Sequence, residues 1–169
     1  MKITNKLTLA AVAATMLFQT SIARADDNGA ATINFTKWVT GLPPLPGAVA
    51  DMAGIIVGGG GGGDVGDGHF TGEVLSNVAG APGVRLIEAV YHLHGAKHSF
   101  TARVHVVQTG SGLSATAVIT GVVTDGWLKG HAVDGAYRVI GQPCRPEGVV
   151  GIGNCFEVTL NIIKRHFND

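Results

Sequence analysis

Histidines are the side chains of this sequence best suited to chemistry, and several of them fall within one short stretch. His92 and His94 are two residues apart, so in a strand they point to the same face. With His98, or with Glu88 brought close by a different turn, they could bind a metal ion, for which zinc or copper would be expected. The alternative is an ordinary solvent-facing strand surface, which often carries histidine, threonine and arginine without any ligand. We expect no cofactor, with this metal site as a minor alternative.

The stretch that carries these histidines predicts a β-hairpin. Its arms are Val84–His94 and His98–Thr109, joined by a short turn around Ala96-Lys97. A loop at Ala96-Lys97 sets the register in which the two arms pair. One face of the hairpin then consists of apolar pairs: Leu93 with Phe100, Tyr91 with Ala102, Ala89 with Val104 and Ile87 with Val106. The opposite face pairs His94 with Ser99, His92 with Thr101 and Glu88 with His105, the last as a cross-strand charge pair. Because side chains alternate along a strand, only one register sorts both arms in this way.

The apolar face supplies the candidates for lining an interior. From the hairpin they are Tyr91, Leu93, Phe100 and Val104, and from later segments Ile119 and Trp127. Trp127 follows an Asp-Gly turn, where it would either touch a ligand at the mouth of a barrel or pack in the core.

The N-terminus has the three parts of a secretory signal peptide. A basic start, Met1–Lys6, precedes the apolar run Leu7–Phe18, and Ser21–Ala25 ends in the small-x-small pattern that signal peptidase cleaves. Residues 1–25 are too short an apolar segment to be retained as a membrane span. We therefore expect a periplasmic or secreted protein, cleaved near Ala25.

The two cysteines fit an exported protein. Cys144 and Cys155 flank a Gly- and Pro-rich segment, and in an oxidising compartment the expected outcome is a disulfide that closes this loop. A metal or redox pair is the weaker alternative, because the sequence has no Cys-x-x-Cys spacing.

Composition excludes some partners. Cleavage would remove Lys2, Lys6 and Arg24 but no acidic residue, which leaves a mildly acidic chain without a basic patch. This argues against nucleic acid and anionic membranes as partners. A homo-oligomer is compatible with the sequence.

The chain divides into a signal peptide (1–25), an N-terminal strand with a Pro- and Gly-rich flexible arm (26–67) and a barrel domain (68–169). Ala31–Val39 predicts the first strand, and Ala48–Val57 a short helix or a buried loop. The glycine run Gly58–Gly63 is not followed by the Gly-Lys-Ser/Thr of a phosphate-binding loop. It overlaps the repeat of a calcium β-roll, but a single copy cannot form a stacked roll. We interpret it as a flexible linker before the main domain.

Short strands separated by turn signals predict an all-β fold. They begin at about Phe70, Val84, His98, Leu113, His131 and Phe156. We expect a small antiparallel, calycin-like β-barrel of about 7–8 strands, with a β-sandwich as the alternative. A barrel is favoured because closure removes exposed strand edges, which this chain has few charges to protect.

The segment Gly68-His-Phe-Thr-Gly-Glu73 opens a strand that is followed by successive hairpins and a C-terminal strand. In this order and in its glycine placement the chain resembles the barrels of allene oxide cyclases and dirigent proteins, and exported bacterial proteins of similar size. The likeness covers roughly residues 68–165. It implies binding of apolar small molecules in the lumen, and no catalytic residue of those families maps onto this chain.

His92-Leu-His94 with His105 on the next strand also resembles the zinc hairpin of α-type carbonic anhydrases. The register contradicts it, because His105 lies opposite Glu88, four residues or ~13 Å along the strand from His92. Three ligands of one zinc ion cannot span that distance.

Three functions remain open from the sequence. The first, which we prefer, is a barrel that binds a small apolar molecule. An enzyme is therefore the less favoured interpretation. The second is an isomerase or cyclase of the allene oxide cyclase type, which would need polar groups pointing into the lumen. The third is a structural or surface-interaction protein with a solid barrel.

Overall fold

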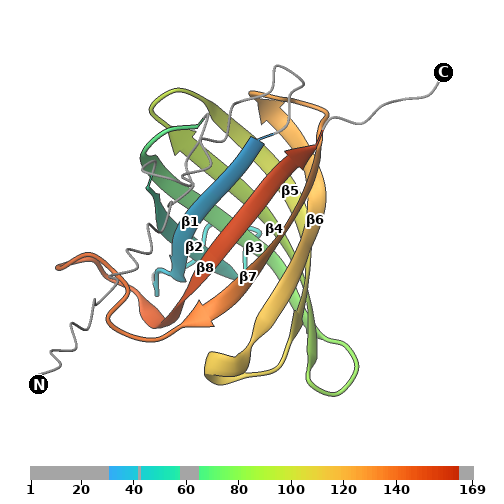
Figure 1. Cartoon of the computed structure of the whole chain (residues 1–169). Coiled ribbons are helices and arrows are strands. Elements are labelled where there is room, and N and C mark those ends of the chain that lie inside the picture. The colour runs from blue at the N-terminus through green and yellow to red at the C-terminus, as the bar shows by residue number, and fades with distance from the viewer. Residues whose placement is uncertain (1–30, 42, 58–64, 164–169) are drawn as a thin grey trace, which may run out of the picture.

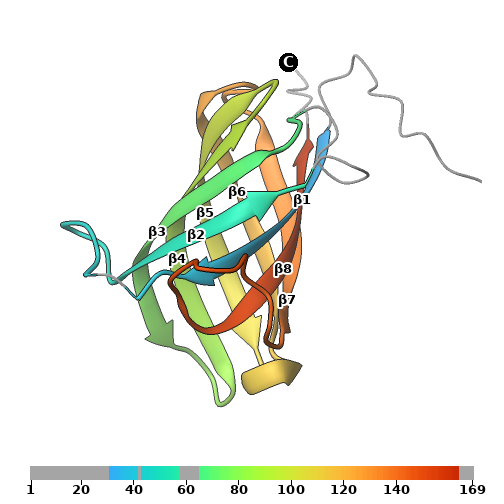
Figure 2. The ribbon, with the colours of Figure 1, turned by 90° about the vertical axis from the view of Figure 1, so that its left-hand side faces the viewer.

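The chain folds into a closed antiparallel β-barrel of eight strands, seen from two sides in Figures 1 and 2. This is a computed structural model, and it describes residues 31–41, 43–57 and 65–163. The strands are β1 (Ala31–Val39), β2 (Ala50–Ile56), β3 (Gly68–Ala79), β4 (Val84–Gly95), β5 (Ser99–Thr109), β6 (Thr116–Gly126), β7 (Ala132–Ile140) and β8 (Ile152–Ile163). The expectation of an all-β barrel is confirmed, and the closed sheet rules out the sandwich alternative.

Each strand pairs with its neighbours in the sequence, and β1 pairs with β8 to close the sheet. Ile33 lies opposite Leu160, and Phe35 opposite Val158, along this closing seam. All eight contacts between neighbouring strands are antiparallel. Closure leaves no free edge, so the backbone groups of β1 and β8 pair with each other rather than with solvent or another chain.

The predicted hairpin is confirmed residue by residue. Leu93 lies opposite Phe100 and Glu88 opposite His105, as the alternation of apolar and polar residues indicated. Tyr91, Leu93 and Phe100 point inward and are buried, whereas His105 on the other face is exposed. The turn between the strands is closed by the backbone N–H of Gly95, which donates to the carbonyl of His98 (3.1 Å).

The inward side chains differ in size between the two ends of the barrel. Near the β4–β5 turn the interior is filled by large residues, among them Phe70, Leu93 and Phe100. At the opposite end, where β1 stops and β2 begins, the inward positions include Ala50 and Ala89. An eight-stranded barrel is just wide enough for its side chains to fill it or to hold one small ligand, so small residues at one end leave space there.

The expectation of a helix or buried loop over Ala48–Val57 is wrong, because Ala50–Ile56 forms strand β2. The period-two signal is hidden here, since the outward residues Ala53 and Ile55 are as apolar as the inward Met52 and Ile56. The barrel therefore includes β1 and β2, whereas the sequence predicts a barrel domain that begins at residue 68. Inward glycines also weaken the pattern. A Cβ on Gly54 would lie 2.3 Å from the carbonyl oxygen of Thr36, so only glycine permits this close approach of β2 to β1.

The glycine run Gly58–Gly63 and the predicted signal peptide lie outside the described residues. The strands on either side of the glycine run are paired neighbours, with Ile56 opposite Gly68. The run therefore joins two adjacent strands of one barrel rather than an N-terminal strand and the main domain, and its flexibility stays a prediction.

The predicted disulfide between Cys144 and Cys155 is present, with 6.0 Å between the Cα atoms. It closes the β7–β8 connection, which folds back over the outer side of β1. Trp38, which points outward from β1, is only 3% exposed because Gly151 of this connection lies against its ring. A disulfide indicates an oxidising compartment.

No helix among residues 31–41, 43–57 and 65–163 is long and apolar enough to cross a membrane.

We predict that the disulfide stabilises the fold through this loop. Replacing both Cys144 and Cys155 by Ala should lower the free energy of unfolding by about 3 kcal/mol, because the unfolded chain regains the entropy of an open loop. Urea unfolding measures this effect. In a Trp127→Phe background, where Trp38 is the only remaining tryptophan, acrylamide should also quench fluorescence more strongly once the cysteines are removed. An unchanged unfolding midpoint and unchanged quenching would contradict this role for the loop.

Candidate functional site

The interior of the barrel contains one charged residue, Lys37. It is the only buried polar or charged residue in the described part of the chain, with 3% of its surface exposed. Residues 31, 33, 35, 37 and 39 of β1 share the inward face, so the strand's own alternation carries the lysine inside with Ile33 and Phe35. Its neighbours across the sheet are Gly54 on β2 and Phe156 on β8.

Lys37 lines a cavity of about 190 Å³ inside the barrel. The walls are mainly aliphatic and aromatic, with polar groups at a few positions. The lining residues are Lys37, Val39, Val49, Ala50, Met52, Val74, Asn77, Ile87, Ala89, Tyr91, Val106, Gln108, Tyr137 and Phe156. At roughly 30 Å³ for each water molecule, the cavity has room for about six waters or a small organic molecule. Val49 is 58% exposed, so the cavity reaches the surface at this end.

Aromatic rings surround the amine of Lys37. Its Nζ lies 4.3 Å from the centre of the Tyr91 ring and 4.9 Å from that of Tyr137. Phe156 and Phe70 are farther away, at 5.8 and 6.0 Å. Ring faces attract a cation, so these four rings replace part of the hydration that an ammonium group loses on burial. Nζ also donates a short hydrogen bond to the hydroxyl of Tyr91.

Burial changes the acid–base properties of this cluster. Removal from water lowers the pKa of Lys37 from 10.5 to about 7, because the charged form loses its solvation. The same effect raises the pKa of Tyr137 to about 12 and that of Tyr91 still further, with a small contribution from Tyr137 to the latter. Both phenols therefore stay protonated at neutral pH, whereas the amine exists in both forms.

Two amides and a phenol form the polar part of the cavity's outer end. The hydroxyl of Tyr137 donates to Oε1 of Gln108 at 2.7 Å. Asn77 joins the cavity because a bulge between Val74 and Ser76 shifts the register of β3 and places Asn77 opposite the inward-facing Ile87. Its Oδ1 accepts a hydrogen bond from Arg85 at 2.8 Å.

The lumen residues expected from the sequence divide between cavity and core. Tyr91 lines the cavity. Leu93, Phe100, Val104 and Ile119 are buried in the packed core and do not line it. Trp127 packs against the core in the β6–β7 turn at the filled end, where its ring stacks on His98 at 4.5 Å. Of the cavity's polar residues, the sequence analysis missed Lys37, Tyr137, Gln108 and Asn77.

The histidines proposed as metal ligands lie on the outer surface, where each contacts a neighbouring side chain instead of a shared centre. His92 contacts Thr101 at 3.1 Å and Glu73 at 3.6 Å. His94 stacks on His69 at 4.7 Å, and its pKa is lowered by desolvation and by the neighbouring His69 and His92. His98 lies against Trp127 instead of joining this pair. The described residues contain no group of three or more His, Cys, Asp or Glu side chains that could hold a metal ion.

The other charged residues of the hairpin's outer face form an exposed cluster. Glu88 contacts Arg103 at 3.0 Å and His105 at 3.5 Å. The hydrogen bond from Arg103, more than the charge of His105, lowers the pKa of Glu88. The cross-strand pair expected from the sequence is therefore present, and exposed pairs of this kind contribute little to stability.

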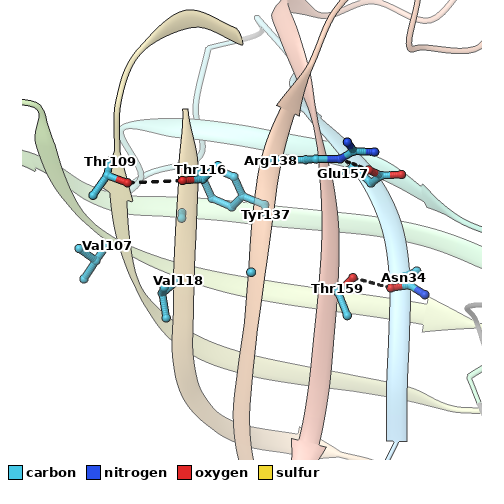
Figure 3. A pocket seen from close by; sticks show the side chains of 11 residues that line it. Asn34, Val107, Thr109, Thr116, Val118, Tyr137, Arg138, Glu157 and Thr159 are labelled. Carbon is cyan, nitrogen blue, oxygen red and sulfur yellow. Dashed lines mark hydrogen bonds and ion pairs between the residues drawn. The ribbon is translucent and has the colours of Figure 1, made fainter. Parts of the chain in front are cut away.

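A larger hollow of about 820 Å³ lies on the outer surface, across β5 to β8 and β1 (Figure 3). Most of its lining side chains point away from the barrel interior. Several of them are already bonded to each other, including Thr109 to Thr116, Thr159 to Asn34 and Arg138 to Glu157 (Figure 3). The hollow is open and holds no buried charged group, so the smaller inner cavity is the better candidate for a specific site.

Comparison with known proteins found no match to any family model, to any curated protein or to any solved structure. The resemblance to allene oxide cyclase and dirigent barrels stays an expectation from the sequence.

We predict that the buried amine of Lys37, which has no carboxylate partner among the described residues, destabilises the barrel in a pH-dependent way. Between about pH 7 and 9.5 the folded amine is neutral while the unfolded one is protonated, so unfolding takes up a proton and stability rises with pH. Below this window both states are protonated and the full cost of burial is felt. Lys37→Met should therefore raise the free energy of unfolding by at least about 1 kcal/mol at pH 7.

Urea unfolding at several pH values between 6.5 and 9.5 measures this effect. The gain from Lys37→Met should shrink toward pH 9.5, by at most about 1.4 kcal/mol for each pH unit. Lys97→Met removes an exposed lysine and is the matched control, which should follow the wild type. A gain that does not vary with pH would show that the amine is not titrating near pH 7.

Proposed function

We propose that this protein binds a small apolar molecule in the lumen of its barrel. The observation that carries the proposal is the unfilled cavity of about 190 Å³, whose walls are mostly Val, Ala, Ile, Met and aromatic side chains. Apolar cavities of about 150 Å³ bind molecules the size of benzene. A cavity lined mainly by apolar groups with a few convergent polar groups is the usual form of a small-molecule site.

The polar groups of the cavity favour a second candidate, an isomerase or cyclase that works in the same lumen. Such an enzyme needs polar groups that point inward, and the inner wall presents Lys37, Tyr91 and Tyr137. Binding is preferred because most of the lining is apolar, and among the described lining residues only the Lys37 amine titrates near neutral pH. The structural or surface-interaction role would be favoured if no small molecule enters the cavity.

We predict that filling the cavity abolishes binding of an apolar probe. Ala89 lines the cavity, so Ala89→Leu places three additional carbon atoms in it at a cost of about 1–3 kcal/mol in stability. Titration of the isotopically labelled protein with 1-hexanol, followed by amide chemical shifts, should give saturable binding to the wild type and at least tenfold weaker binding to this variant.

The matched control makes the same substitution in the outer hollow. Ala136 is exposed and lines only that hollow, so Ala136→Leu should leave hexanol binding unchanged. If Ala136→Leu weakens binding and Ala89→Leu does not, the ligand binds outside the barrel. If the wild type binds neither hexanol nor its carboxylate analogue hexanoate, the proposed function is wrong.

The proposed function includes export to the periplasm or the medium. The disulfide, which needs an oxidising compartment, and the signal-like sequence of residues 1–25 support this location. When the full chain is expressed in a bacterial host, intact mass spectrometry of the exported protein should give a chain that begins at Asp26 and is two mass units lighter than its reduced form. A product that keeps residues 1–25, or that stays in the cytoplasm, would contradict export.

A further inference from the structure

We propose that the ligand of the lumen is a small monocarboxylic acid, with its carboxylate bound by Lys37 and Tyr91 and its apolar chain directed toward the outer end of the cavity. This inference rests on the proposed function, because it specifies the chemistry of a molecule in the same cavity.

The first argument is the missing partner of Lys37. The amine is buried, lines the cavity, and among the described residues bonds only to the Tyr91 hydroxyl and to no carboxylate. By contrast, Arg138 on the outer surface pairs with Glu157, and Arg103 pairs with Glu88. A buried ammonium group that no protein acid neutralises is complementary to a ligand that brings one negative charge.

The second argument is the balance of hydrogen-bond donors and acceptors. The hydroxyl of Tyr91 accepts a hydrogen bond from Lys37, which leaves its own proton without an acceptor among the described residues. Tyr91 is 1% exposed, so that proton also has little access to bulk water. The ammonium group and the phenol thus offer donors to a common acceptor, and a carboxylate is an acceptor with two oxygens and no proton.

The third argument is the distribution of polarity along the cavity. Lys37 and Tyr91 are the most deeply buried polar groups of the cavity, and the wall toward the exposed Val49 includes Val39, Ala50 and Val74. The polar residues at that outer end already have partners, since Tyr137 bonds to Gln108 and Asn77 to Arg85. A molecule with its acid group inside and a short hydrocarbon chain outward matches this order. The volume of about 190 Å³ limits the chain to a few carbon atoms. A single cation also favours a singly charged head group over a doubly charged phosphate.

Ligand charge can be tested with two probes of nearly the same shape. Hexanoate and 1-hexanol differ mainly in the head group, and calorimetric or chemical-shift titrations at pH 6.5 give both dissociation constants. We expect hexanoate to bind the wild type at least tenfold more tightly than hexanol. Lys37→Met should remove this preference by weakening hexanoate at least tenfold while hexanol still binds. Lys97→Met is the control and should keep the preference.

A measurement on the unaltered protein guards against a variant that misfolds. Because the carboxylate needs the protonated amine, hexanoate affinity should fall above about pH 7 by up to tenfold for each pH unit, and hexanol affinity should not. The phenols of Tyr91 and Tyr137 stay protonated throughout this range and do not add to the effect.

The outcomes separate the two proposals. Equal binding of hexanoate and hexanol, without pH dependence, would overturn the inference and leave the binding barrel in place. The imine that hexanal forms with a lysine amine can be trapped by borohydride reduction. Trapping on Lys37 rather than on other lysines, together with equal binding of hexanoate and hexanol, would also overturn the inference and indicate a carbonyl ligand. Binding of neither hexanoate nor hexanol would overturn the proposed function itself.

Discussion

The pairing of β1 with β8 is the constraint on which the rest of this structure depends. It joins the first and last strands of the sheet, so each strand has a neighbour on both sides and the inward side chains become an enclosed interior. Without that seam, the inner faces of β1 and β8 would be open to water at two edges. With it, any inward position must be filled by a side chain, by solvent or by a ligand, and the size of the residues there decides which.

The position of Lys37 follows directly from closure. In an open sheet its long side chain could reach water around the edge of β1, but in the closed barrel the same position is surrounded by Tyr91, Tyr137 and Phe156. The aromatic rings and the Tyr91 hydroxyl reduce the cost of burying the amine without supplying an opposite charge. The result is a group whose protonation depends on whatever else occupies the cavity, since its pKa of about 7 is close to neutral pH.

Sequence reasoning succeeded where both faces of a strand pair are clearly different. In β4 and β5 apolar and polar residues alternate over the whole hairpin, which determined the register of Leu93 with Phe100 and of Glu88 with His105. It failed at β2, where the outward Ala53 and Ile55 are as apolar as the inward residues and Gly54 interrupts the pattern. The disulfide was predictable because the expected export and the loop-like segment between the two cysteines both favoured it.

The candidate site was less accessible from the sequence, for two physical reasons. The alternation of β1 does place Lys37 inside with Ile33 and Phe35, but the adjacent Trp38 obscures it, since a tryptophan is the more usual inward residue. Trp38 is instead buried on the outer side, under a loop that comes from the far end of the chain. The cavity itself depends on summed side-chain volumes from seven different strands, including Ala50 of β2 and Ala89 of β4, and no local pattern reports such a sum.

Charged groups on the outside of the barrel differ from the one inside it, and this difference indicates which surface is the better candidate for a functional site. On the outside, charged groups such as Glu88, Arg103 and Arg138 have partners and lie in water, where such pairs add little to stability. Inside, a single amine is buried at a real energetic cost beside a space that two larger side chains could have filled. A sequence selected for stability alone would place an apolar residue at position 37 and larger ones at positions 50 and 89. Local departures from good packing and charge pairing that coincide in one place are typical of binding and active sites, which is why the inner cavity, rather than the histidine-rich outer face, carries the functional argument.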